Sequence, residues 1–222
     1  MMKLPIKTIR GVQGGLKAWN ILLTIPGLRE LTIEWTGQCR DIANDITDAN
    51  MMCGITKLHL SNFLLDNEVL EKVMRVFYRL DELFLQVQHL DGDEYAPLQI
   101  FDAADLQRTL RSQRATLRIL TLSEVLELEH LGDESQYEEL RGKLQLQEFV
   151  ALQHLRVDHY MLLGCADDES NDLLEVYKWL PPSLKSLEVS FYPCFPDETS
   201  MADFLVQNSI RLKLIAKMKP TN

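Results

Sequence analysis

Two groups of side chains in this sequence have residue types that chemistry would need. His59 and Ser61 lie two residues apart, and a histidine beside a serine is the pair that activates the hydroxyl in hydrolases. His154, His159 and Cys165 offer the nitrogen and sulfur ligands that zinc prefers. A triad also needs an acid behind the histidine, and the second group matches no zinc-ligand spacing. We therefore expect no catalytic site, no metal and no cofactor.

Two further segments resemble ligand loops only in composition. The cluster Asp167-Asp168-Glu169 lacks the glycine and the terminal glutamate that a calcium loop places at fixed offsets. The segment GVQGG, residues 11–15, follows no strand and lacks the Lys-Ser/Thr pair of a phosphate loop. We expect the first to be a solvated loop and the second a flexible start to a helix.

The amino-acid composition limits the kinds of partner and the cellular location that we expect for the protein. The 222 residues include 23 Lys plus Arg and 33 Asp plus Glu, which gives a formal net charge of −10. Such a charge repels phosphate backbones and anionic lipid, so we expect neither a nucleic-acid nor a membrane partner. The four scattered cysteines and the absence of a signal-like start favour a cytoplasmic or nuclear location.

One hexamer, apolar-x-x-Leu-x-apolar, recurs six times along the chain. The copies are LRELTI from Leu28, ITKLHL from Ile55, LDELFL from Leu80, LRILTL from Leu117, LQHLRV from Leu152 and LKSLEV from Leu184. The fourth position is always Leu and the sixth always aliphatic, and a two-residue step puts both on one face of a strand. Six copies without a failure at the central Leu therefore predict six half-buried strands.

The sequence between the hexamers changes to a helical period. Asp66 is expected to cap a helix with Val69, Val73, Phe77 and Leu80 on one stripe, and Asp102 to start a second with Leu106 and Leu110. A third helix, marked by Leu173, Tyr177 and Leu180, is expected to end at Pro181-Pro182. Strand and helix units of this kind predict an α/β fold, an irregular leucine-rich-repeat solenoid with its parallel sheet on the concave side and its helices on the convex side.

The spacing of the repeats sets the expected domain organisation. Successive hexamers start 27, 25, 37, 35 and 32 residues apart, whereas ordinary leucine-rich repeats run about 20 to 29 residues. We expect residues 28–199 to form six irregular repeats with insertions at 86–105, 125–145 and 164–172. Residues 1–27, with the stripe Leu16, Trp19 and Leu23, and residues 200–222 would form the N-terminal and C-terminal capping helices.

The third, fifth, seventh and eighth residues of each repeat are expected to face outward on the concave surface of the sheet. Binding energy concentrates on aromatic and arginine side chains, so these are the candidate partner contacts. The predicted partner-binding residues are Trp35, His59, Phe84, Arg156, Asp158 and Phe191. Two alternatives remain open: a loop covers Phe84, and Trp35 packs at the edge of the sheet.

Three stretches resemble the repeat region of fungal F-box and leucine-rich-repeat proteins. They are LQLQEFVALQHLRVDHYMLLG (144–164), YKWLPPSLKSLEVSF (177–191) and LRSQRATLRILTLSE (110–124). In that family a helical F-box docks on the adaptor of a cullin-based ubiquitin ligase, and the repeats hold the target protein. The residues before Leu28 lack the F-box pattern, so the resemblance implies a ligase adaptor as partner only if an F-box lies upstream.

These observations favour a non-catalytic protein-protein interaction module. By resemblance it is the substrate-recognition repeat region of an F-box type ubiquitin-ligase receptor. The alternatives are a stand-alone leucine-rich-repeat scaffold or inhibitor without a ligase link, and a small enzyme built on an open parallel sheet. The partner protein itself is not identified by any of these residues.

Overall fold

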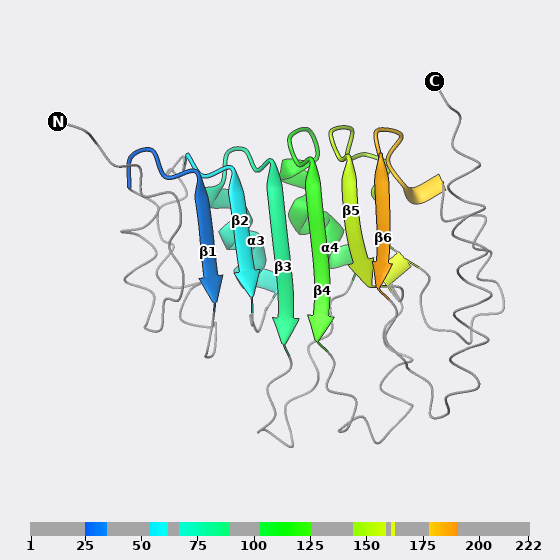
Figure 1. Cartoon of the computed structure of the whole chain (residues 1–222), viewed down its shortest axis with the longest axis horizontal. Helices are drawn as coiled ribbons and strands as arrows, with labels where there is room; N and C mark the ends of the chain where they lie inside the picture. Colours follow the sequence, from blue (N-terminus) through cyan, green and yellow to red (C-terminus); the bar gives the residue numbers. More distant parts are fainter. Residues whose placement is uncertain are drawn as a thin grey trace, which may run out of the picture.

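A six-stranded parallel β-sheet, whose strands follow their order in the sequence, forms the centre of the structure (Figure 1). The computed structural model describes residues 25–34, 54–61, 67–88, 103–125, 144–158, 161–162 and 178–190. The strands are β1 (Glu30–Glu34), β2 (Lys57–Ser61), β3 (Glu82–Gln88), β4 (Ile119–Val125), β5 (His154–Asp158) and β6 (Ser186–Ser190). Each contains the central Leu of one hexamer, so the six predicted strands are confirmed.

The register of the sheet aligns the hexamers position by position. The central leucines pair across all five interfaces, in the order Leu31, Leu58, Leu83, Leu120, Leu155 and Leu187. All of them except Leu187, which is partly buried, are at most 2 % exposed. Burying each leucine is worth about 1.5 to 3 kcal/mol, so this row is a large part of the hydrophobic driving force.

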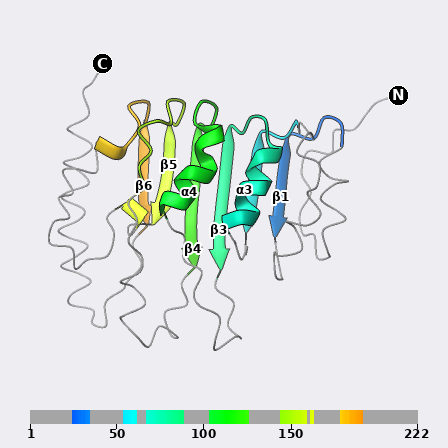
Figure 2. The same ribbon diagram turned by 180° about the vertical axis from the view of Figure 1, so that it is seen from behind.

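Within the described residues, two helices cover the face of the sheet that carries the leucines, which we call the helical face (Figure 2). They are α3 (Asn67–Val76) and α4 (Ala103–Leu110), and the second continues into a 3-10 turn, η1 (Arg111–Gln113). Val73 and Phe77 are buried beneath the first, and Leu106 and Leu110 beneath the second. The helices predicted after Asp66 and Asp102 are therefore confirmed, although Phe77 and Leu80 of the first predicted stripe follow the end of α3.

The opposite face of the sheet carries the third, fifth and seventh residues of each repeat, and we call it the open face. Of its eighteen side chains, all but one are exposed or half-buried. The sheet is not curled (Figure 1), so the expected concave curvature is not observed. The leucine spacing fixes which side of each strand is buried, whereas curvature depends on the packing between repeats.

The chain enters successive strands in the same way. The carbonyl of the second residue of each repeat accepts hydrogen bonds from the backbone N–H groups of the second and third residues of the next repeat. Arg29 O, for example, accepts from Thr56 N at 2.9 Å and from Lys57 N at 3.0 Å. The same pair of bonds recurs at the carbonyls of Thr56, Asp81, Arg118 and Gln153. This shared geometry keeps the repeats in register despite their unequal lengths.

A tight turn at Pro26-Gly27 precedes the first strand. Gly27 has a φ of 85° and follows Pro26, and Leu28 N donates to Ile25 O at 3.3 Å. Proline followed by a residue with positive φ is the pattern of a type II turn, and this turn leads into β1. The remaining sequence predictions concern the two capping helices, most of the third helix and most of the insertions, and they lie outside the described residues.

Candidate functional site

The open face arranges its side chains in rows that cross the sheet. Neighbouring strands are about 4.8 Å apart, so equivalent residues of adjacent repeats lie side by side. The first row is Glu30, Lys57, Glu82, Ile119, His154 and Ser186, and the second is Thr32, His59, Phe84, Thr121, Arg156 and Glu188. The first row and the second therefore combine acidic, basic and aromatic groups on one surface.

Glu82 joins two basic side chains of β2. Its Oε2 lies 2.9 Å from Lys57 Nζ, and its Oε1 lies 3.2 Å from His59 Nε2. Partial burial raises the pKa of Glu82, but the hydrogen bonds and charges of Lys57 and His59 outweigh it and hold that pKa below its ordinary value. The hydrogen bond and charge of Glu82 raise the pKa of Lys57 in turn. The three side chains form one ionic cluster.

Phe84 extends this cluster along β3. Its ring centroid lies 5.6 Å from that of His59, with the two ring planes tilted by 42°. His59 therefore covers part of the aromatic surface, and Phe84 is half-buried rather than fully exposed. The two predicted contact residues are brought together, and the remaining surface of the Phe84 ring is accessible to a partner.

A second polar group lies across β5 and β6. Arg156 Nε is 3.4 Å from Glu188 Oε1, and His154 Nδ1 is 2.7 Å from Ser186 Oγ. The side chains of Arg156 and Glu188 are 51 % and 66 % exposed, so the guanidinium keeps donors free to bond a partner. Arg156 thus occupies the exposed position that the sequence predicted.

Asp158 is a buried member of the predicted set. Its position in β5 is on the outward side, opposite Ser190 of β6, yet its side chain is 0 % exposed. The structure therefore does not place Asp158 on the accessible surface of the open face, and its contact with a partner stays a prediction. Strand periodicity fixes the direction of a side chain but does not tell what covers it. Trp35 and Phe191 lie outside the described residues.

His59 and Ser61, the first group with reactive residue types, bind separate partners in the structure. His59 and Ser61 project from the same face of β2, and the hydroxyl of Ser61 donates to Ile33 O at 3.5 Å rather than to the imidazole. The carboxylate beside His59 is Glu82, which Lys57 also binds. Among the described residues no three His, Cys, Asp or Glu side chains come close enough to hold a metal ion. His159 and Cys165 fall in segments that the structure does not describe.

A hollow at the amino ends of the strands is the feature that sequence reasoning missed. It has a volume of about 550 Å³, and its lining includes Arg79, Arg118 and Lys185. Arg118 and Lys185 are second residues of their repeats, and each directly precedes its strand. The signal available in the sequence was the polar character of this position in all six hexamers.

The fold and the two surfaces define an α/β protein with an open parallel sheet. No protein-family model matches the sequence, and no curated protein and no solved structure matches it. Within the part of the chain that the structure describes, no helix is long and apolar enough to cross a membrane. The function is therefore argued from the surfaces themselves.

Proposed function

We propose that this chain is a non-catalytic protein-interaction module that holds a partner protein against the open face of its sheet. The observation that carries the proposal is the one-sided cover of a six-stranded parallel sheet. Parallel sheets normally have both faces covered, since crossover helices lie on each side. Here the described helices, α3 and α4, both lie on the helical face, and the open face carries exposed and half-buried side chains that another molecule can contact.

The composition of the open face supports a protein partner. Protein interfaces favour aromatic residues and arginine, with charged groups that set orientation. Phe84 and Arg156 supply such anchors, and the Lys57–Glu82–His59 cluster supplies a fixed pattern of charge beside Phe84. In the enzyme alternative, substrates of open α/β sheets bind at the carboxyl ends of the strands. The hollow described above lies at the amino ends instead, so it is not the substrate site that this alternative expects.

The finer assignment rests on the leucine repeats and on the family resemblance. We propose an irregular leucine-rich-repeat architecture, because six hexamers share one register and one pattern of backbone hydrogen bonds. The proposed role is target recognition in an F-box type ubiquitin-ligase receptor. A stand-alone scaffold or inhibitor uses the same face, and it differs only in having no ligase component in its complexes.

The test starts from partners recovered by affinity purification and mass spectrometry from the native cell. The recovered partner is then titrated against purified parent chain, Phe84→Ala and Arg156→Glu. We expect each variant to weaken binding about tenfold or more, because truncated anchors at interfaces cost over about 1 kcal/mol. Tyr78→Ala and Arg108→Glu are matched controls, since Tyr78 is exposed outside the open face and Arg108 is an exposed arginine paired with Asp105.

The outcomes separate the candidates. Unchanged affinity in both open-face variants, with the fold intact by circular dichroism, would remove the open face as the binding site. Cullin components in the purified complex favour the receptor, whereas their consistent absence favours the scaffold.

A further inference from the structure

The backbone ladder at the amino ends of the strands places the second residues of the repeats in one row. Each carbonyl in this row binds the N–H groups of the next repeat, so the spacing of the row is that of the strands. The side chains of the row are Arg29, Thr56, Asp81, Arg118, Gln153 and Lys185. Over β4, β5 and β6 the row is Arg118, Gln153 and Lys185, which contains two cations and no acid.

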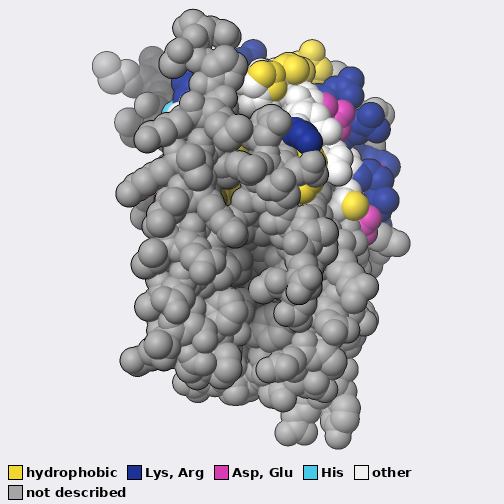
Figure 3. Space-filling model, turned by 90° about the vertical axis from the view of Figure 1, so that its right-hand side faces the viewer, with side chains coloured by type: hydrophobic (Ala, Val, Ile, Leu, Met, Phe, Trp, Pro, Cys, Tyr) yellow, Lys and Arg dark blue, Asp and Glu magenta, His cyan; other side chains and the backbone are white. Residues whose placement is uncertain are grey.

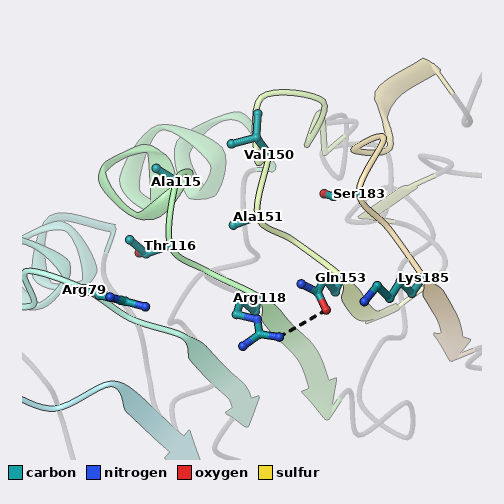
Figure 4. A pocket seen from close by; sticks show the side chains of 9 residues that line it. All are labelled: Arg79, Ala115, Thr116, Arg118, Val150, Ala151, Gln153, Ser183 and Lys185. Atoms are coloured by element: carbon teal, nitrogen blue, oxygen red, sulfur yellow. Dashed lines mark hydrogen bonds between the residues drawn. The ribbon is translucent and has the colours of Figure 1, made fainter.

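This part of the row forms the floor of the 550 Å³ hollow, which we call the amino-edge pocket. Arg79, Arg118, Gln153 and Lys185 lie one after another across the pocket (Figure 4). Above them lie Ala115, Ala151 and Val150, and Val150 is 62 % exposed although it is apolar. The pocket therefore combines a cationic side with an apolar side.

The cations of the pocket are only partly neutralised within the protein. Arg79 Nε lies 3.3 Å from Asp81 Oδ1, so this charge is shared with an acid. Arg118 instead donates to the neutral amide Gln153 Oε1 at 3.5 Å. Among the described residues, neither Arg118 nor Lys185 forms an ion pair with a carboxylate, although Arg75, Arg108 and Arg156 each do.

Glu148, two residues before Val150 of the pocket, is engaged by other cations. Glu148 Oε2 lies 3.4 Å from both Arg111 Nε and Arg114 Nη1, so two guanidinium groups share this one carboxylate. In the described part of the surface, Lys and Arg side chains, with some Asp and Glu side chains between them, lie near exposed hydrophobic groups (Figure 3). A chain with a net charge of −10 thus carries a locally cationic edge.

We propose that the amino-edge pocket is a second binding site that takes an extended acidic peptide segment of a partner protein. Arg118 and Lys185 stand two strand spacings apart, about 10 Å. Carboxylates two to four residues apart in an extended peptide span about 7 to 13 Å, so one segment reaches both cations. The guanidinium of Arg118 has the planar donors that bind a carboxylate bidentately. Val150 and the two alanines contact the apolar side chains between the acids.

The charge of the whole chain selects a peptide over a nucleic acid. A polyanionic backbone brings many closely spaced phosphates and meets the repulsion of the −10 protein over its full length. A short acidic segment needs only the local cations and gains the apolar contacts as well. The site is distinct from the open face, so it provides a second contact on the partner or a contact for another protein.

The experiment uses fluorescence anisotropy with the full chain and a fluorescein-labelled peptide in which Glu alternates with Ala. We expect saturable binding that weakens as sodium chloride is added, because salt screens exposed charges. Arg118→Glu and Lys185→Glu should each weaken binding about tenfold. Lys72→Glu makes the same change of charge at an exposed position of α3 and should bind as the parent does. Thermal unfolding checks that all variants remain folded.

Three kinds of result would contradict the proposal. No binding of the Glu-Ala peptide, or equal binding of a peptide in which Gln replaces Glu, removes the carboxylate site. An equal loss in Lys72→Glu assigns the effect to net charge alone. Competition by inorganic phosphate or single-stranded DNA at lower concentration than by the unlabelled peptide assigns the pocket to phosphates. Phe84→Ala should leave peptide binding unchanged, so failure at this pocket and failure at the open face are distinguishable.

Discussion

The side chain of Gln113 bonds the backbone that leads from α3 into β3. Its Oε1 accepts from Leu80 N at 3.0 Å, and its Nε2 donates to Phe77 O at 2.7 Å. Gln113 is 1 % exposed, and it lies more than thirty residues further along the chain than the groups it binds. Water cannot reach the N–H of Leu80 and the carbonyl of Phe77 in this buried turn, so the side-chain amide of Gln113 supplies their hydrogen-bond partners.

Replacing this amide by a hydrocarbon is expected to destabilise the fold. In Gln113→Leu the N–H of Leu80 and the carbonyl of Phe77 lose their partner in a buried site, which costs about 1 to 3 kcal/mol. Urea unfolding followed by circular dichroism measures this loss. Gln107→Leu is the control, since Gln107 is half-buried in α4. Glutamine and leucine have similar helix propensity, so this change should affect stability little. If both variants unfold at the same urea concentration, the side chain of Gln113 has no such role.

The ion pair of Lys57 and Glu82 makes a small part of the stability depend on pH. The pKa of Glu82 is lower in the folded chain than its ordinary 4.5, so its contribution is present above about pH 4.5 and is lost as the pH falls through the lowered value. The pKa of Lys57 is raised above 10.5, so its contribution is present below 10.5 and lost at higher pH.

We therefore expect Glu82→Gln to lower the free energy of unfolding at about pH 7, by about 1 kcal/mol or less because the side chains are partly exposed. The difference from the parent should be smaller at about pH 3, because this contribution is lost as the pH falls through the lowered pKa of Glu82. Urea titrations at the two pH values test this. Glu34→Gln, an exposed residue of β1, should change stability little at either pH. A constant difference at both pH values would contradict the ionic origin.

At the scale of the element, each strand has one face packed against the core and one face toward the open side of the sheet. In β4, Leu120 and Leu122 are 0 % exposed on the helical face, whereas Thr121 between them is half-buried on the open face. Leu120 also pairs with Leu83 on one side and Leu155 on the other. A change at Leu120 therefore acts on three repeats at once.

Leu120→Asp is expected to abolish the cooperative thermal transition, because it buries an unpaired carboxylate in the middle of the leucine row. Thr121→Asp makes a comparable change one residue later on the open face and should keep the fold, with a loss of about 1 kcal/mol from reduced strand propensity. Differential scanning calorimetry of the two variants compares them directly. A normal transition for Leu120→Asp would show that the register of β4 is wrong.

At the scale of the whole molecule, the strands are not equally buried. The inward leucines of β4 are fully buried, whereas Leu187 and Val189 of β6 are only partly buried. Local opening is easiest where few apolar contacts are lost. The sheet is therefore expected to open from β6 before it opens at β3 and β4.

Hydrogen exchange measures this order of opening. We expect the backbone amides of β6 to exchange at least about tenfold faster than those of β4, since a difference of 1.4 kcal/mol in opening corresponds to a factor of ten. Mass spectrometry of peptides covering residues 117–125 and 184–190 provides the comparison. Equal protection of both strands would show that the sheet opens as a single unit.

The sequence by itself determined which face of each strand and helix is buried. A Leu at the fourth hexamer position and an aliphatic residue at the sixth are enough to set the buried face of every strand, because side chains alternate with a period of two. The helical stripes Val73 and Phe77, and Leu106 and Leu110, followed in the same way from a period of 3.6.

Only the tertiary structure decided which distant groups meet. The carbonyls bound by Gln113, the burial of Asp158 and the flatness of the sheet depend on the packing of segments that are far apart in the chain. The row of Arg118, Gln153 and Lys185 likewise exists only because the repeats pair in register. Periodicity is a property of a few adjacent residues, whereas cover, curvature and pockets arise between repeats of unequal length.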